Sequence, residues 1–179
     1  MEFSSYWHHA PPHFLENSGV YIVTGSTLHK EHFFDDPASK DQLQSLFFSG
    51  CLEFGWKLHA WALFSNHYHF IADSPEDPQS LSKMLSKLHM QTAKWINERD
   101  VKPGRKVWYQ FWETKITYER SYWPRLRYVH ENPVKHRMAK DARDYPWCSA
   151  AWFFLKAPKA MQRKLLSFKT DQLNLYDDF

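Results

Sequence analysis

The sequence predicts an α+β fold of the ferredoxin-like, split βαβ type, with a four-stranded antiparallel sheet and two helices on one face. Three observations predict it. Short runs rich in β-branched and aromatic residues alternate with longer stretches of helical period. The first six predicted elements follow the order β-α-β-β-α-β. A seventh predicted element, a helix, comes after them. The 179 residues, 43% of them hydrophobic, suit one domain with a buried core.

The first strand and the first helix have clear boundaries. Residues 20–27 (VYIVTGST) are β-branched and aromatic, which is typical of a strand. Asp36 and Pro37 open a helix with apolar residues on one face, and Gly55 stands where a helix commonly ends.

Two strands and the clearest helix of the chain follow. Residues 57–65 (KLHAWALFS) and 67–73 (HYHFIAD) predict strands so close together that only a tight turn or a bulge at Asn66 can join them. A helix begins at Asp77-Pro78. Its expected buried stripe has members three and four residues apart, namely Leu81, Met84, Leu85, Leu88, Thr92, Trp95 and Ile96.

The seventh element is a helix over residues 121–132, which follows a strand over residues 107–119. Pro124 is tolerable only in the first turn of this helix. We expect the helix to end at Asn132, because Pro133 pushes the residue before it out of helical geometry. The helix must pack near the second face of the sheet or at its edge.

The charge is concentrated in one segment. Residues 101–140 hold ten Lys and Arg against three acidic residues, a net charge of +7, whereas the rest of the chain carries −4. Such a segment is typical of a protein with a phosphate-rich partner, although on charge alone a solvated basic face is the preferred explanation. No apolar run approaches the roughly 20 residues of a membrane span, no signal peptide is apparent, and two cysteines make no disulfide framework, so we expect a cytoplasmic protein.

His67 and His69 stand two residues apart in a predicted strand. Alternate residues of a strand point to the same side, so both imidazoles project from one face and Tyr68 points to the other. Two imidazoles on a rigid strand form half of a metal site. The alternative is a pair of partly exposed strand histidines without a ligand.

Tyr128 and Asn132 stand four residues apart and share a helix face. A side-chain amide oxygen is a suitable ligand for Mg²⁺ or Mn²⁺, so Asn132 would complete the site that the two histidines begin if this helix crosses the sheet. Tyr128 would then lie one turn away as a nucleophile. The alternative is a packed tyrosine and a helix-capping asparagine.

Three stretches together resemble the REP-associated tyrosine transposases, relatives of the single-strand insertion-sequence transposases of the HUH superfamily. They are WALFSNHYHF, WYQFWETKITYERSYWPRLRYVHENPV and YPWCSAAWF. The resemblance covers roughly residues 6 to 154 and makes residues 1–179 one HUH-type domain. It implies a core at about 18–137, a lead-in at 1–17 and an extension at 138–179.

The resemblance implies a catalytic role for individual residues. His67, His69 and Asn132 match the metal ligands, Tyr128 matches the nucleophile, and the metal would be Mg²⁺ or Mn²⁺. The implied activity is cleavage and rejoining of single-stranded, hairpin-bearing DNA through a 5′-phosphotyrosine, by a monomer or a homodimer. The expected DNA contacts are Arg120, Arg125, Arg127, Lys135 and Arg137, with Arg125 also able to assist the phenol. Two departures are Tyr68 in place of the usual aliphatic residue, and VKHRMAK after Pro133 in place of a basic run with a glycine.

Two other functions fit the sequence less well. A module of the same fold could bind a DNA or RNA hairpin without cutting it, and a metallohydrolase using activated water would not need Tyr128. The histidines of the first third match no ligand spacing and give weak support for a second metal site; they are His8, His9, His13, His29 and His32. The recognised DNA sequence, the identity of the metal and a mobile or domesticated role stay open.

Overall fold

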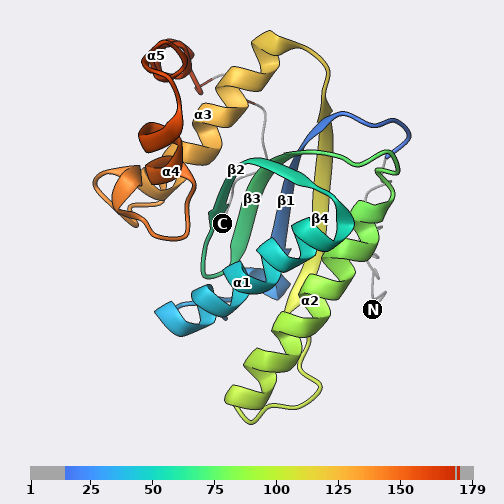
Figure 1. The fold of residues 1–179 in the computed structure, drawn as a ribbon. Helices are drawn as coiled ribbons and strands as arrows, with labels where there is room; N and C mark the ends of the chain where they lie inside the picture. The colour runs from blue at the N-terminus through green and yellow to red at the C-terminus, as the bar shows by residue number, and fades with distance from the viewer. Residues whose placement is uncertain (1–14, 172, 174–179) are drawn as a thin grey trace, which may run out of the picture.

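A computed structural model describes residues 15–171 and 173 and contains a four-stranded antiparallel sheet in the order β2-β3-β1-β4 (Figure 1). The strands are β1 (Val20–Thr27), β2 (Lys57–Leu63), β3 (His67–Asp73) and β4 (Trp108–Ile116). The element order and the sheet confirm the predicted ferredoxin-like fold. Residues 1–14 of the predicted lead-in lie outside the described part of the chain.

Two long helices, α1 (Pro37–Phe54) and α2 (Ser80–Arg99), cover one face of the sheet. The start of α1 is where the sequence predicts it, because the Asp36 carboxylate accepts a hydrogen bond from the Ser39 backbone N–H at 3.0 Å. The helix ends at Gly55, whose φ of 75° is left-handed. The apolar stripe of α2 is buried as expected, with Trp95 partly buried at its margin.

The second face of the sheet is covered by α3 (Glu119–Lys135), which packs mainly on β2 and β3 (Figure 1). Two short helices, α4 (Ala150–Lys156) and α5 (Lys159–Ser167), complete this layer, together with the single-turn η2 (Ala142–Asp144). A further turn, η1 (Leu28–Lys30), follows β1. Among the described residues, no helix is both long and apolar enough to cross a membrane.

The expected boundaries of α3 are wrong at both ends. The helix begins at Glu119, which puts Pro124 in the second turn, and it continues through Pro133 to Lys135. Pro133 has no N–H to donate to the Val129 carbonyl one turn earlier. The Cys148 thiol lies 3.9 Å from that oxygen and 3.8 Å from the His130 carbonyl oxygen, so a weak sulfur donor stands beside the turn that Pro133 interrupts.

The turn after α3 forms without the expected glycine. Arg137 adopts a left-handed φ of 59°, which costs a non-glycine residue about 1–2 kcal/mol. The backbone N–H of Met138 donates to the Pro133 carbonyl at 2.8 Å and closes the turn. Arg137 therefore takes the backbone role that a glycine would have filled.

Tyr68, the second departure, has room because Gly25 faces it across the β1–β3 pair. A Cβ atom at Gly25 would lie 2.2 Å from Cζ of Tyr68, closer than atoms can approach. The Tyr68 hydroxyl hydrogen-bonds Nε2 of His89 at 2.9 Å, and the His89 ring stacks on Trp108 with centroids 4.3 Å apart. Burial lowers the pKa of His89 to about 3, so its ring is neutral and Nε2 can accept the hydroxyl proton.

Gly25→Ala should therefore lower the free energy of unfolding by about 2 kcal/mol or more, as overpacking of a core does. Urea denaturation measures the loss. Tyr68→Val in the same chain should recover part of it, because the smaller side chain vacates the space. Gly50→Ala in α1 is the matched control, since its Cβ would meet only the flexible Met84 side chain at 3.3 Å. Equal stability of the Gly25 and Gly50 variants would contradict the steric explanation.

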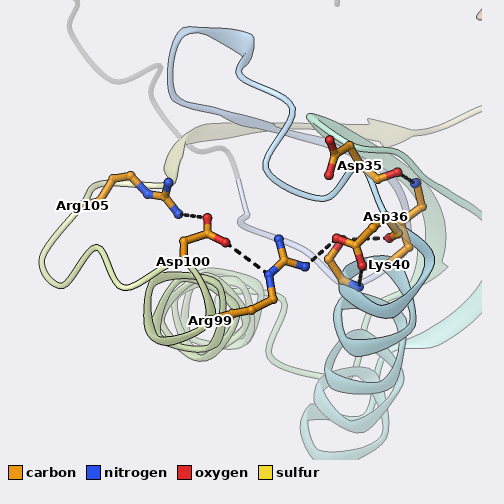
Figure 2. Close-up of polar contacts among 7 residues, drawn as sticks. Asp35, Asp36, Lys40, Arg99, Asp100 and Arg105 are labelled. Carbon is orange, nitrogen blue, oxygen red and sulfur yellow. Dashed lines mark hydrogen bonds and ion pairs between the residues drawn. The ribbon is translucent and has the colours of Figure 1, made fainter.

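A chain of charged groups ties the end of α2 to the start of α1 (Figure 2). Arg105 donates to Asp100 at 2.7 Å, and Arg99 donates to Asp100 at 3.2 Å and to Asp36 at 2.5 Å. Partial burial of Asp36 opposes ionisation, but hydrogen bonds from Ser39 and Arg99 outweigh it and lower the pKa of Asp36 to about 2. The carboxylate thus stabilises the fold above the ordinary aspartate pKa near 3.9 and loses this effect as the pH falls through about 2.

The stability difference between the wild-type protein and Asp36→Asn should shrink as the pH falls from about 5 to about 2. Asparagine can still cap α1 but cannot pair with Arg99. Chemical denaturation at several pH values measures the difference. A difference that does not change with pH would show that the ion pair contributes nothing to it.

The outer edge of β2 is covered by a segment from the C-terminal layer. The Leu63 N–H donates to the Trp147 carbonyl, and the Ser149 N–H donates to the Trp61 carbonyl, both at 2.9 Å. The Ser149 hydroxyl in turn accepts a hydrogen bond from the Trp61 N–H at 2.9 Å. Residues 147–149 therefore occupy the position of a further strand beside the second half of β2.

Candidate metal and nucleophile site

His67 and His69 lie side by side on the sheet face that α3 covers. Their ring centroids are 5.0 Å apart, both residues are buried, and Tyr68 between them points to the α1–α2 layer. The strand geometry predicted from the two-residue spacing is therefore present, and the two histidines are buried instead of partly exposed, while their binding of a ligand stays a prediction.

Two neighbouring side chains fix the imidazole rings. The Asn66 amide donates to the Lys30 carbonyl at 3.1 Å, which turns its oxygen toward Nδ1 of His67 at 2.7 Å. An amide oxygen only accepts, so the proton is on Nδ1 and the lone pair of His67 is on Nε2. Thr24, opposite His69 in the β1–β3 register, places its hydroxyl 2.7 Å from Nδ1 of that ring.

The helix α3 brings Tyr128 to His69, and Asn132 follows one turn later on the same helix. The Tyr128 ring lies 5.3 Å from the His69 ring at an angle of 70°. Asn132 is fully buried, and neither its amide oxygen nor its amide nitrogen has a hydrogen-bond partner. A buried amide without partners is costly, and a cation bound to its oxygen would remove part of that cost.

The donor set of two imidazole nitrogens and one amide oxygen fits a divalent ion such as Mg²⁺ or Mn²⁺. Over residues 15–171 and 173, no group of three His, Cys, Asp or Glu is arranged to hold a metal. The candidate set differs from such groups because its third member is Asn132. His67, His69 and Asn132 as metal ligands, and Tyr128 as the nucleophile, stay predictions.

Asn132→Leu should show separately how the buried amide affects the stability of the fold and how it affects metal binding. Leucine has a similar size and no polar atoms, so the metal-free variant should be more stable than the wild type by about 1 kcal/mol or more. Its affinity for Mn²⁺ should fall at the same time. Denaturation in EDTA and titration with Mn²⁺ measure the two effects. A less stable variant with unchanged Mn²⁺ affinity would show that the amide is purely structural.

The end of α3 contributes two residues that the sequence pattern did not place here, one in its last turn and one at its C-cap. The Lys135 ammonium lies 5.2 Å from the Tyr128 ring centroid, and the His136 ring lies 4.9 Å from the His67 ring. Both continue the helix face of Tyr128 and Asn132 by one turn. The three- and four-residue spacing from Asn132 would have predicted both positions, but the helix was expected to end at Asn132.

The predicted DNA contacts have different surroundings. Arg120 and Arg137 are exposed at the two ends of α3, and so is Lys135. Arg125 is half-buried and donates to the Ser121 carbonyl at 3.0 Å, and burial lowers its pKa.

Arg127 has a structural position. It donates to Glu131 at 2.7 Å and to the carbonyl oxygens of Leu166 and Phe168 at 2.9 and 2.5 Å, which fastens the end of α5 to α3. Contacts between DNA and the five basic residues stay predictions.

The early histidines do not form a second site in the described residues. His8, His9 and His13 lie outside that part of the chain. His32 hydrogen-bonds the Ser65 hydroxyl through Nδ1 at 2.6 Å, and His29 forms part of η1.

Comparison with a family model identifies the family of the chain. The sequence model described as "Transposase IS200 like" matches residues 19–124, more than half of the chain. The chain belongs to the IS200-like transposase family. The match includes His67 and His69 and ends before Tyr128.

Two relatives of this IS200-like transposase confirm the resemblance seen in the sequence. A REP-associated tyrosine transposase of Escherichia coli (strain K12) is 26% identical over 92 residues, which are 51% of this chain and 53% of the relative. The chain thus aligns with about half the length of that protein. A solved structure of a REP-associated tyrosine transposase bound to a REP hairpin superposes with a TM-score of 0.68 over 96% of this chain and 94% of the other, at 17% identity. The superposition shows that the two chains share a fold.

Proposed function

We propose that this IS200-like transposase cleaves and rejoins single-stranded, hairpin-bearing DNA through a covalent bond to Tyr128. The observation that supports the proposal is the position of α3, which sets the Tyr128 ring 5.3 Å from His69, while Asn132 is buried one turn further along the same helix. Hairpin DNA is proposed as the substrate because a structural relative is bound to a REP hairpin.

In the proposed reaction, the Tyr128 oxygen attacks a backbone phosphorus, and the bond from phosphorus to the 3′ oxygen breaks. The leaving 3′ oxygen takes up a proton, which balances the proton that the phenol loses, so the products are a 5′-phosphotyrosine and a 3′-hydroxyl. The reverse attack by a 3′-hydroxyl rejoins DNA without a separate energy source. His67, His69 and Asn132 would hold Mg²⁺ or Mn²⁺, which when bound stabilises the charge on the phosphate and aligns it. Lys135 provides a positive charge beside the ring that must lose its proton.

A second candidate is a hairpin-binding module that does not cut. It is favoured by the burial of Tyr128, which is only 6% exposed, so DNA reaches its hydroxyl only if α3 shifts. The module would need neither the tyrosine nor a metal.

A covalent-capture experiment tests the proposal. Labelled DNA hairpins with single-stranded flanks are incubated with the protein in Mg²⁺, Mn²⁺ or EDTA and analysed on denaturing gels. A metal-dependent protein–DNA adduct supports the proposal. Cleavage without an adduct would indicate attack by water, and binding without cleavage across a panel of hairpins would favour the non-cleaving module.

A further inference from the structure

A cavity of about 520 Å³ opens between α3, α4, α5 and the first half of β2. Its volume lies in the range of sites for small organic groups, roughly 300–1,000 Å³. The walls are apolar and include Leu126, Phe153 and Met161. The metal and nucleophile site described above does not use this cavity.

Trp152 stands at this cavity with half of its surface exposed. Its ring is 6.3 Å from the ring of Trp61 and tilted by 38°, so one side is supported by a neighbouring aromatic residue. An exposed, supported indole is a suitable platform for a planar group, since every nucleobase has a face that can stack on it.

Two of the residues that line the cavity, Tyr122 and His59, are polar and hydrogen-bonded. The Tyr122 hydroxyl is 3.1 Å from Nδ1 of His59, and Nε2 of the same ring is 3.0 Å from Asp73. With a neutral ring, the hydroxyl donates to Nδ1 and Nε2–H donates to the carboxylate. The Tyr122 oxygen then keeps a lone pair that can accept a hydrogen bond from an amino group of a bound base.

The charge near the opening suits an anion. Residues 156–164 contain four Lys or Arg and no acidic residue. Lys164 pairs with Glu119, and Lys159 donates to Gln162, whereas Lys156 is exposed and lines the cavity. A planar platform with a cation at its rim matches a nucleotide, whose base is flat and whose phosphate is negative.

We infer that this cavity receives one unpaired base from the single-stranded flank of the DNA, with Trp152 stacking on the base and Lys156 beside its phosphate. The inference rests on the proposed DNA substrate. Tyr122 is on α3, six residues before Tyr128, so the bound base would be held along the helix that carries the nucleophile.

Binding without catalysis tests the inference. Affinity for a DNA hairpin with single-stranded flanks, and for the same hairpin without flanks, is measured by fluorescence anisotropy in EDTA. Trp152→Ala should weaken binding of the flanked hairpin roughly tenfold and leave the blunt hairpin unaffected. Trp152→Phe should restore most of the affinity. Lys156→Glu should weaken binding and lower the salt slope by about one. Met90→Ala, at an exposed position of α2, is the control.

The possible results distinguish failure of this inference from failure of the proposed function. Equal binding of the flanked hairpin by wild type and Trp152→Ala would overturn the inference and leave the proposed function intact. Failure of the wild type to bind any DNA would overturn both. Binding that depends on Trp152, together with no covalent adduct when Mg²⁺ or Mn²⁺ is present, would support the cavity and contradict the cleavage chemistry. Sedimentation showing that Trp152→Ala dissociates a dimer would assign the cavity to an interface between copies and overturn the inference.

Discussion

Tyr128→Phe is expected to abolish the protein–DNA adduct and to lower the cleavage rate by at least about a thousandfold, while DNA binding changes by less than about twofold. The substitution removes one oxygen atom and keeps the ring that packs 5.3 Å from His69. A loss of cleavage with intact DNA binding and an unchanged denaturation midpoint is therefore a loss of chemistry. Single-turnover cleavage with denaturing gels measures the rate.

Tyr118→Phe is the matched control. Tyr118 is the residue before the first turn of the same helix, ten residues before Tyr128, and it is 68% exposed to solvent. This variant should form the adduct at the wild-type rate. Cleavage that persists in Tyr128→Phe would mean that water is the nucleophile, and the proposed mechanism would then be wrong.

His69→Ala should weaken binding of Mn²⁺ by more than about a hundredfold and reduce metal-dependent cleavage to the level seen in EDTA. The ring is fully buried between the sheet and α3, so no other side chain can easily replace it. Thr24→Val is the variant for comparison and should have a smaller effect on metal affinity, because the Thr24 hydroxyl only orients the His69 ring through Nδ1. Loss of such a supporting hydrogen bond commonly costs about 10–100-fold in metal affinity.

The two variants are compared by Mn²⁺ titration followed by electron paramagnetic resonance, and by cleavage at increasing Mn²⁺. High Mn²⁺ should restore cleavage in Thr24→Val and fail to restore it in His69→Ala. If His69→Ala binds Mn²⁺ like the wild type, the imidazole pair is not a metal site and the two histidines serve the packing of α3.

The sequence was most informative where a local physical rule applies. The two-residue period of a strand placed His67 and His69 on one face, and the acidic cap and left-handed glycine marked both ends of α1. Reasoning failed at α3, because the rule for residues before proline is a preference that tertiary contacts can overcome. The helix continues through Pro133, and the thiol of Cys148, sixteen residues beyond Asn132, lies 3.9 Å from the Val129 carbonyl to which Pro133 cannot donate.

The residues that orient His67 and His69 could be found only from the tertiary structure. Asn66 is next to His67 in the chain, yet its role depends on the distant Lys30 carbonyl that orients its amide. Thr24 reaches His69 only through the β1–β3 register. Residue spacing does not predict which residues of two strands are paired when a helix separates the strands in the chain. The positions of Lys135 and His136, in contrast, could have been predicted by extending the Tyr128–Asn132 face of α3 by one more turn.

The covered edge of β2 limits how two copies of this chain can associate. An exposed strand edge invites a second molecule to add its own strand, and this is a common route to dimers and to aggregates. Beside residues 61–63 that place is taken by the chain's own residues 147–149, whose hydrogen bonds an incoming strand would have to displace. If the transposase forms a homodimer, its two sheets do not join through this part of β2, and substitutions in residues 147–149 should increase self-association instead of preventing it.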